Sequence, residues 1–571
     1  MRTKGVTRPA VLGAAVGALL GVVVLGPALA PGYTLHYDLV FVPDLPLSAR
    51  TLGTDGSVPR AVPNDLVVAL LGTVLPGWLV QKLVLLGCFV LGGAGAGRLA
   101  RTAPGAVATA TLWSWNPWVG ERLGIGHWGY LLGFALLPWV LAAATRVRTA
   151  RGRALLAAGL TAAALGGSTP GVLATLVAAV TVLCVPGSLG RRLRDLGAVA
   201  GIALLANAAW WWPFLRASSH AADAGGAAAF AAGADTPFGV PGSLILGGGL
   251  WNDRTWFAER AAWPVALGAL LAVVLVLVLA LAVRRRAWWC RPVSRAATVS
   301  GVIGLLLAAL AALPGGRALL EAVVTTVPGG GLLRDGQKFV ALWVLLLAVA
   351  TAVVVDGIVE RGLPRVLVAV AVLWPVATLP TLAWGHAGAW GSVAYPDDVL
   401  TVAREVGGSG EPAAVFPWST YRRYAWDGDR VVLDPWNRLL PQRVVSDDRL
   451  PLRDRTVAGE DPASARVAQA LATGEDVPAL LRSLGVRWVV VQTDQPAPEG
   501  TVPALDGLPT RTVGDLEVVD LGATTAAGGP SDPLRGLGLA GTAAALVLAL
   551  GGLWRTRGRG AGGTSGRLAG K

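Results

Sequence analysis

Six stretches of the sequence contain no charged residue and are close to or above the length that crosses a lipid bilayer. They are 11–30, 154–190, 196–215, 261–283, 296–316 and 536–554. A transmembrane helix needs about 20 mainly apolar residues. Only 15% of the 571 residues are charged and the mean hydropathy is +0.58, whereas soluble domains carry roughly 25% charged residues. The sequence therefore predicts an integral membrane protein with several spans.

Motifs of metalloproteases and of ATP-driven pumps are absent from the sequence. The three cysteines, Cys88, Cys184 and Cys290, are widely spaced and form no CxxC pair. The four histidines are scattered, and neither HExxH nor GxxxxGK[ST] occurs. These absences disfavour both classes.

Short basic loops set the predicted orientation, because loops rich in Arg and Lys stay in the cytoplasm. We expect twelve spans with both termini inside, at about 9–30, 78–97, 103–116, 127–145, 154–166, 171–186, 196–215, 263–283, 296–314, 338–356, 366–383 and 536–554. Reading 66–81 as a further span would move the later Arg clusters outside, so 66–77 is interpreted as an apolar helix on the outer leaflet. The first span is expected to remain as a signal anchor, since Pro31 follows the small-residue motif Ala28-Leu29-Ala30.

Charge also divides the chain into domains. Residues 384–530 hold 13 basic and 20 acidic residues, a net charge of −7, while the remainder holds 35 and 15, a net charge of +20. We therefore predict a mainly α transmembrane domain at 1–383 with outer loops 31–77, 216–262 and 315–337. A small extracytoplasmic α+β domain follows at 384–530, with strands at 486–491 and 516–521 and one or two helices over 461–484. Residues 531–571 form a last transmembrane helix and a basic cytoplasmic tail.

The first polar cluster lies directly after the first span. Asp38 and Asp44 are the candidate catalytic acids, and His36 is a candidate substrate-binding residue. An acid at this depth could act as a general base on a sugar hydroxyl, or bind a divalent cation such as Mg²⁺ or Mn²⁺ together with phosphates. A solvated loop carboxylate is the alternative, and the identity of any metal ligand stays open.

A second cluster lies between the third and fourth spans. Pro117 is expected to end the third span, so that Asn116 caps a short helix that carries Glu121 and Arg122. His127 opens the fourth span. Polar groups between membrane helices are costly unless they are paired or hydrated. Substrate binding and a purely structural lock around Arg122 are both open.

The third cluster follows the glycine-rich sequence Gly329-Gly330-Gly331. Arg334 and Lys338 are four residues apart, so on a helix they would share one face, with Asp335 able to pair with either. Two cations beside a glycine-rich turn suit a phosphate at the membrane surface. The alternative is a pair of snorkelling anchors.

Together the three clusters resemble the GT-C superfamily of polyprenyl-phosphate-dependent glycosyltransferases, in particular arabinofuranosyltransferase-like and YfhO-type membrane proteins. Tyr37-Asp38 resembles the acidic motif of their first outer loop. The second motif is Asn116-Pro117…Glu121-Arg122-Leu123…Gly126-His127-Trp128, with His127 where Gln is common, and the third is Arg334-Asp335-x-x-Lys338-Phe339. The resemblance covers about 30–390, and Asp38 departs from it by lacking a clear Asp-Asp or Asp-x-Asp pair.

The resemblance implies a glycosyltransferase in a bacterial plasma membrane. It would move a sugar from a polyprenyl-phosphate donor to a cell-envelope glycan or glycoprotein on the outer face, with Asp38 as base and basic residues on the leaving phosphate. No cofactor is certain, and neither the nucleotide-binding nor the nucleic-acid-binding class is indicated. A catalytically inactive envelope-assembly protein and a transporter are the rival hypotheses. Only four of the 48 basic residues are Lys, a bias typical of actinobacterial genomes.

Overall fold

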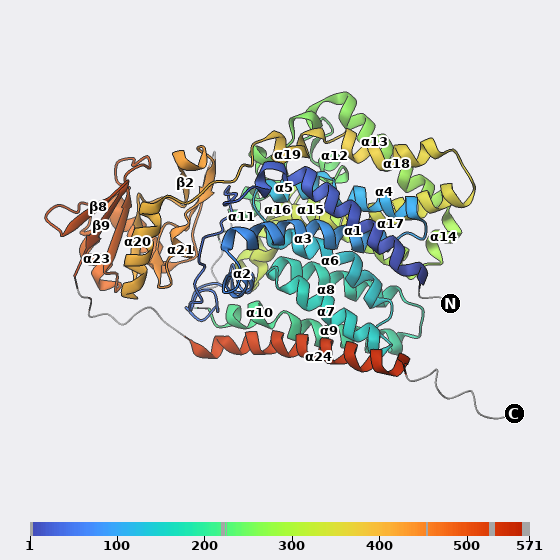
Figure 1. Cartoon of the computed structure of the whole chain (residues 1–571), viewed down its shortest axis with the longest axis horizontal. Helices are drawn as coiled ribbons and strands as arrows, with labels where there is room; N and C mark the ends of the chain where they lie inside the picture. The colour runs from blue at the N-terminus through green and yellow to red at the C-terminus, as the bar shows by residue number, and fades with distance from the viewer. Residues whose placement is uncertain are drawn as a thin grey trace.

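The computed structural model describes residues 4–217, 223, 225–452, 455–522, 524 and 532–561. A bundle of apolar helices forms most of the molecule, and a smaller body that contains a β-sheet lies at one end of it (Figure 1). The first three residues and residues 562–571, which belong to the predicted cytoplasmic termini, lie outside the described residues.

Every predicted span coincides with a helix of the bundle. These helices are α1 (Lys4–Leu25), α3 (Gly77–Gly97), α4 (Ala103–Ser114), α6 (Trp128–Ala144), α7 (Ala150–Ala164), α8 (Ser168–Cys184), α9 (Leu189–Ala206), α10 (Ala208–Leu215), α13 (Trp263–Val278), α15 (Pro292–Ala309), α17 (Val340–Glu360), α18 (Arg365–Ala377) and α24 (Leu537–Ala561). Within the described residues, six helical segments are long and apolar enough to cross a membrane, or up to eight if two bent pairs each count as one. The chain is therefore a multi-pass membrane protein, and the count of twelve spans stays a prediction.

Two predicted spans are broken rather than continuous. The span expected at 196–215 is split into α9 and α10, which meet at an angle of 73°. Asn207 lies at the break, where its side chain donates to the carbonyl of Ala203 and accepts from the indole of Trp210. The span expected at 366–383 bends by 66° after α18, at Pro380. A side chain that competes for a helix carbonyl and a proline are both ordinary causes of helix breaks.

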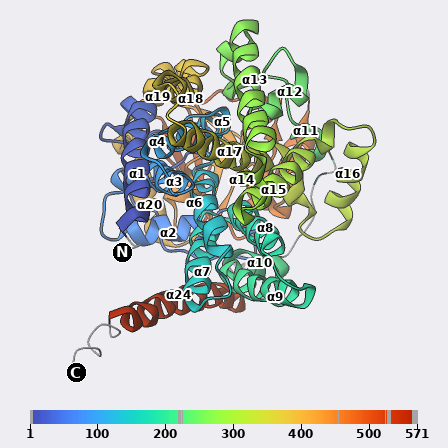
Figure 2. The same ribbon diagram turned by 90° about the vertical axis from the view of Figure 1, so that its right-hand side faces the viewer.

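Glycines let α1 and α3 pack backbone to backbone. A Cβ atom at Gly13 would lie 2.3 Å from the carbonyl oxygen of Gly93, and one at Gly17 would lie 2.2 Å from that of Phe89. Small residues four positions apart allow this close approach of membrane helices. The pair fixes the start of the loop that carries Asp38. At the opposite side of the bundle, α24 packs along α7, α9 and α10 (Figures 1 and 2).

Shorter helices connect the long ones. They are α2 (Asn64–Gly72), α5 (Pro117–Gly124), α11 (Gly226–Ala229), α12 (Gly239–Ile245), α14 (Arg285–Trp289), α16 (Gly316–Thr326) and α19 (Ala383–Ala387). Helix α2 and the turn after it expose Leu70, Leu71 and Val74. This is the apolar helix that the sequence predicts over 66–77, and its position on the outer leaflet stays a prediction.

The body at the end of the bundle contains a mixed five-stranded sheet. Its strands are β1 (Ala413–Phe416), β4 (Val444–Val445), β7 (Trp488–Gln492), β8 (Thr510–Val513) and β9 (Leu516–Asp520), in the order β4-β1-β7-β9-β8. Strand β1 is parallel to β4 and β7, whereas β9 is antiparallel to β7 and β8. The expected strands at 486–491 and 516–521 are present as β7 and β9.

Helices and two hairpins complete this body. The helices are α20 (Asp397–Ser409), α21 (Trp436–Leu439), α22 (Pro462–Thr473) and α23 (Val477–Ser483), and the hairpin strands are β2 (Tyr421–Arg423), β3 (Val431–Leu433), β5 (Leu450–Pro451) and β6 (Thr456–Val457). The helical prediction over 461–484 is confirmed as two helices. One sheet face packs on α22 and α23 through Val467 and Leu481. The hairpin β2–β3 reaches the bundle, where the candidate site lies.

Candidate active site

The backbone around Asp38 is attached to three other parts of the chain. Tyr37 forms a bridge to β3, where it donates to the carbonyl of Val431 and accepts from the amide of Leu433 at 2.8 Å. The Asp38 amide donates to the carbonyl of Ile125, which follows α5, at 3.1 Å. The loop after α1 is therefore held between α5 and the hairpin β2–β3.

Gly126 makes this close approach possible. Its φ is +86°, a conformation that glycine adopts without steric cost. A Cβ atom at this position would lie 2.1 Å from the amide nitrogen of Leu39. Only glycine fits here, and its neighbour His127 then points at Asp38.

Two side chains donate to the carboxylate of Asp38. His127 Nε2 lies 3.1 Å from Oδ2, and the hydroxyl of Tyr421 lies 3.1 Å from Oδ1. Burial alone would raise the pKa of Asp38, but the hydrogen bonds from His127 and Tyr421 outweigh it, so the pKa lies below its ordinary value. The side chain is 37% exposed. Asp38 is thus an ionised carboxylate at neutral pH that a ligand can still reach.

The second nitrogen of His127 determines its tautomer. Nδ1 lies 3.0 Å from Nη1 of Arg122. A guanidinium can only donate, so we assign Nδ1 as the acceptor and place the proton on Nε2, which donates to Asp38. His127 thus connects Arg122 to Asp38 through one hydrogen bond on each ring nitrogen.

Arg122 is fully buried and nearly saturated with acceptors. Its guanidinium donates to both carboxylate oxygens of Asp335, at 2.7 and 3.0 Å, and to Oε1 of Gln337 at 2.5 Å. Burial alone would raise the pKa of Asp335, but the charge and hydrogen bonds of Arg122 lower it. Of the two pairings left open for Asp335, with Arg334 or with Lys338, neither forms. Its partner is Arg122, 213 residues away in the sequence.

Glu121 does not pair with Arg122 directly. Gln337 links the two, because its Oε1 accepts from Arg122 and its Nε2 donates to Glu121. The carboxylate of Glu121 accepts from the backbone amides of Gly249 and Leu250 and from the side-chain amide of Gln337, at 3.0–3.1 Å. Asp235 lies beside it and is held by Arg260 at 2.6 Å. Burial, reinforced by the charge of Asp235, raises the pKa of Glu121 well above its ordinary value. Glu121 therefore holds the backbone at Gly249 and Leu250 against α5.

Asn116 and His36 hydrogen-bond to the backbone near the site rather than to Asp38. The side chain of Asn116 accepts from the amide of Val119 at 3.1 Å, which is the predicted cap of α5. His36 Nε2 lies 2.9 Å from the carbonyl oxygen of Leu123, and its ring stacks on Trp390. Burial lowers the pKa of His36 to about 4, so it is neutral. Both side chains are buried and fix the backbone beside Asp38.

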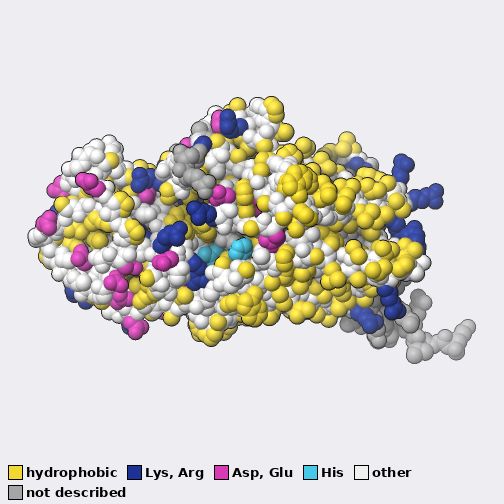
Figure 3. All heavy atoms as spheres, turned by 90° about the horizontal axis from the view of Figure 1, so that it is seen from above, with side chains coloured by type: hydrophobic (Ala, Val, Ile, Leu, Met, Phe, Trp, Pro, Cys, Tyr) yellow, Lys and Arg dark blue, Asp and Glu magenta, His cyan; other side chains and the backbone are white. Residues whose placement is uncertain are grey.

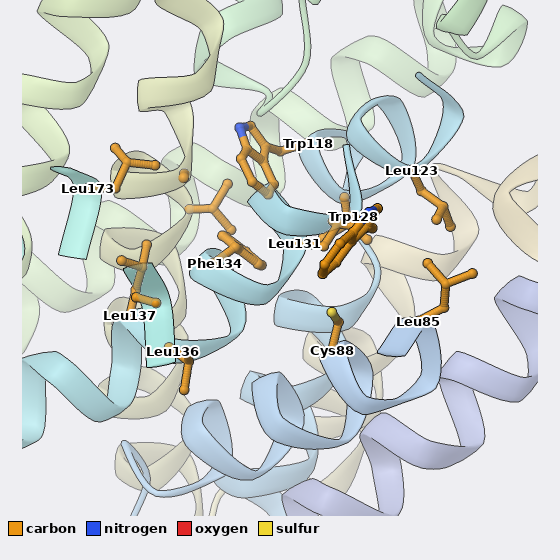
Figure 4. Close-up of a cluster of buried hydrophobic side chains, with 14 of the residues drawn as sticks. Leu85, Cys88, Trp118, Leu123, Trp128, Leu131, Phe134, Leu136, Leu137 and Leu173 are labelled. Atoms are coloured by element: carbon orange, nitrogen blue, oxygen red, sulfur yellow. The ribbon is translucent and has the colours of Figure 1, made fainter. Parts of the chain in front are cut away.

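Below α5, the site rests on an aromatic core (Figure 4). Trp118 stacks on Phe134 with ring centroids 4.6 Å apart, and Trp113 stacks on the same ring at 3.8 Å. Leu131 and Leu137 of α6 belong to the same cluster. The polar network of Arg122 is therefore supported by tightly packed apolar side chains.

The expectation that Arg334 and Lys338 share a helix face is wrong. Asp335 separates two 3₁₀ turns, Gly330–Leu333 and Gly336–Phe339, so the two cations do not lie on one helix. Arg334 lies over the ring of Phe230 and pairs with Glu460 at 3.6 Å. Lys338 instead points into the bundle.

Lys338 is buried without an ionic partner. Its ammonium donates to the hydroxyl of Thr169 at 3.1 Å, and the side chain is 4% exposed. No carboxylate of the described residues forms an ion pair with it. The Thr169 hydroxyl in turn contacts that of Tyr130, whose ring packs against His127. Lys338 is therefore connected to the surroundings of Asp38 through neutral groups.

Asp44 does not join the site. It is exposed and makes no hydrogen bond or ion pair with another residue in the described part of the chain. Those residues also contain no group of three His, Cys, Asp or Glu side chains that could bind a metal ion together. Among the described residues, the partners of Asp38 are an imidazole and a phenol, and no second carboxylate hydrogen-bonds beside it.

Sequence reasoning missed three residues that the structure brings to the site. Tyr421 and Gln337 contact Asp38 and Arg122, and Thr169 contacts Lys338. Gln337 lies inside the Arg334–Phe339 motif but is uncharged, so the charge pattern did not single it out. Thr169 lies between the predicted spans at 154–166 and 171–186. Tyr421 is 383 residues from Asp38 and carries no local signal.

Comparison with solved structures shows a similarity of fold. The chain shares its overall fold with a solved arabinofuranosyltransferase, in agreement with the resemblance in the sequence. The structures that it matches are those of the arabinofuranosyltransferase AftD from Mycobacteria. One cryo-EM structure aligns with a TM-score of 0.57 and 18% identity over 90% of this chain and 40% of AftD. Two structures of an AftD mutant align with TM-scores of 0.54 at 17% and 18% identity, over 90% of this chain and 41% of AftD.

The similarity is one of fold. The chain spans about 40% of the length of AftD. No protein-family model matches the sequence, and no curated protein sequence is similar to it.

Proposed function

We propose that this chain is a membrane glycosyltransferase that moves a sugar from a polyprenyl-phosphate donor to a hydroxyl of a cell-envelope glycan or glycoprotein. The observation that carries the proposal is the Asp38 carboxylate, kept ionised by His127 and Tyr421 and still 37% exposed. Because the fold matches an arabinofuranosyltransferase, an arabinofuranosyl donor is the first to test.

The chemistry assigned to Asp38 is general base catalysis. The acceptor oxygen attacks the anomeric carbon of the donor, the bond from that carbon to the phosphate oxygen breaks, and the acceptor proton passes to Asp38. The electron pair of the broken bond leaves with the phosphate. Attack opposite the leaving group inverts the anomeric centre.

Lys338 is the residue best suited to the leaving phosphate. A buried ammonium without a counter-ion is costly, and an anion that arrives beside it removes that cost. Among the described residues its ammonium makes one hydrogen bond, to Thr169, and lies 5.5 Å from the centroid of the Phe339 ring, so donors remain for an anion. Arg122, in contrast, already donates to Asp335, Gln337 and His127. We therefore assign Arg122 to positioning His127 and Asp335 rather than to binding the phosphate.

The distribution of charge supports an outward-facing site. Arg and Lys side chains gather at the end of the molecule opposite the sheet body, whereas Asp and Glu gather on that body (Figure 3). Basic ends of membrane helices face the cytoplasm. This arrangement supports cytoplasmic termini, an extracytoplasmic location for 384–530 and a bacterial plasma-membrane location. Asp38 would then meet donor and acceptor on the outer face.

Whether transfer depends on a divalent cation such as Mg²⁺ or Mn²⁺ is a question for experiment. The part of the chain that the structure describes contains no group of three His, Cys, Asp or Glu side chains that could hold a metal ion, and the proposed step uses none. Titration with EDTA and then with Mn²⁺ measures whether transfer depends on one.

The test of the proposed function is substitution of the base. Purified protein is incubated with synthetic farnesyl-phosphoryl arabinofuranose and a short arabinan acceptor, and the elongated product is measured. We expect Asp38→Asn to abolish transfer, because the amide cannot accept the proton. Asp55→Asn is the matched control, since Asp55 lies in the same loop and bonds to Ser57. Equal turnover by Asp38→Asn and wild type would remove Asp38 from the mechanism. If the wild type turns over no donor, the result favours the hypothesis of a catalytically inactive envelope-assembly protein over the enzyme hypothesis.

A further inference from the structure

The hairpin β2–β3 belongs to the sheet body but contacts the loop that carries Asp38. Strands β2 and β3 pair antiparallel, and Tyr37 adds to the edge of β3. Tyr421 opens β2, and its ring meets that of Tyr37 edge-on, with centroids 6.4 Å apart. The hairpin therefore places a side chain of the C-terminal half directly beside Asp38.

Tyr421 is a hydrogen-bond donor to Asp38. Burial raises the pKa of its phenol well above the ordinary value, and the Asp38 charge raises it further, so the hydroxyl keeps its proton. The donor–acceptor distance to Oδ1 is 3.1 Å. The other oxygen, Oδ2, accepts from His127. One donor on each oxygen fixes the plane of the carboxylate.

We propose that Tyr421 is a positioning residue for Asp38, so that the sheet body completes the catalytic site rather than only following it in the chain. The proposal rests on the proposed function of Asp38 as the base. With its plane fixed from two sides, the carboxylate presents its remaining lone pairs to the open side, where an acceptor hydroxyl can approach. Reacting groups need this orientation before the chemical step.

The expected signature of Tyr421 is in the pH profile. The titratable and charged groups that face Asp38 are His127 at the start of α6, Tyr421 on β2, Arg438 on α21 and His36 in its own loop. Of these, Tyr421 and His127 hydrogen-bond to the carboxylate and lower its pKa. Loss of one donor raises the pKa of Asp38 in the free enzyme. Transfer requires the ionised form, so the rise of kcat/KM with pH should move to higher pH.

Tyr421→Phe removes the hydroxyl and keeps the ring against Tyr37. We expect the acid limb of kcat/KM to shift upward by about one pH unit, the size expected for losing a hydrogen bond to a charged group. Tyr424→Phe is the matched control, because the Tyr424 hydroxyl donates to Gln492 at 2.6 Å inside the sheet body. The control should lower thermal stability as much as Tyr421→Phe, or more, and leave the acid limb in place.

The outcomes separate this proposal from the proposed function. An acid limb that does not move in folded Tyr421→Phe overturns the positioning role, even when Asp38→Asn abolishes transfer. A limb that moves equally in Tyr424→Phe also overturns it, since the effect would then come from the body in general. Retained turnover in Asp38→Asn overturns both. Thermal unfolding of each purified variant confirms that the compared proteins are folded.

Discussion

Lys338 has no carboxylate partner in the described part of the chain, whereas Arg122 and Arg334 each have one. This difference predicts which cation binds the donor phosphate. Lys338→Met keeps the apolar stem and removes the charge. We expect binding of farnesyl phosphate to weaken by about 1.5–3 kcal/mol, roughly ten- to a hundredfold in Kd, measured by calorimetry in detergent.

The control for Lys338 is a second buried lysine. Lys82 donates to the neutral oxygens of Thr34, Gln81 and Ser392, at 3.0–3.1 Å. Lys82→Met should lower stability and leave the affinity for farnesyl phosphate unchanged. Unchanged affinity in Lys338→Met would instead assign the phosphate to another group.

At the residue scale, sequence motifs identify the functional side chains well. They identify the contact partners of these side chains poorly. Asp38, Arg122 and His127 stand out because polar residues beside apolar spans need a reason to be there. Their contacts depend on separations of 89 and 213 residues that no local pattern encodes. Because two 3₁₀ turns meet at Asp335, Arg334 and Lys338 do not have the spacing of one continuous helix.

At the scale of elements, the turn between α5 and α6 requires a glycine at position 126. Gly126→Ala would strain a backbone with φ of +86° and drive a methyl group into Leu39. We expect a loss of about 1–2 kcal/mol or more in stability. Displacement of Asp38 and His127 should also lower kcat/KM by up to about 100-fold. Thermal unfolding and the transfer assay measure the two effects.

Gly124 provides the comparison on the same element. A Cβ atom there would meet Thr255 at 3.5 Å, which is ordinary contact. Gly124→Ala should therefore be close to wild type in both measurements. If the two variants behave alike, the close approach at Leu39 does not control the site.

Helix positions follow from apolar runs, so every predicted span overlaps a helix of the structure. The bends at Asn207 and Pro380 were not anticipated, because hydropathy averages over a break of one or two residues. The two short 3₁₀ turns before α17 leave no mark in the four-residue spacing of Arg334 and Lys338, on which the expectation of a shared helix face rests. In the sheet body, β7 and β9 were predictable from their runs of Val, whereas β4, β5 and β6 are only two residues long.

At the scale of the whole molecule, orientation is the main prediction. A reporter fused after Ser409 should be active only outside the cytoplasm, and one fused after Arg286 only inside. Ser409 lies at the end of α20 in the acidic sheet body, and Arg286 lies in α14, the short basic helix after α13. Alkaline phosphatase and green fluorescent protein fusions distinguish the two sides. An inside signal at Ser409 would mean that a span has been miscounted.

The global arrangement was predictable in outline because hydropathy and charge act over long segments. They separate the bundle from the sheet body, whose net charge is −7 against +20 for the rest. They do not say that a hairpin from this body reaches back to the first loop. That contact depends on shape and on hydrogen bonds between distant segments.

The bridge between Tyr37 and β3 also has a consequence for biosynthesis. Asp38 emerges from the ribosome early, yet Tyr421 is made 383 residues later. At about 5–20 residues per second, the nascent chain spends roughly 20 to 80 s with its first membrane helix inserted and its site unfinished. A chain interrupted before residue 421 would lie in the membrane without the hairpin, so proteolytic or translational truncation should yield inserted but inert protein. On the proposed roles of Asp38 and Tyr421, activity is thus acquired late in synthesis, after most of the helices have been made.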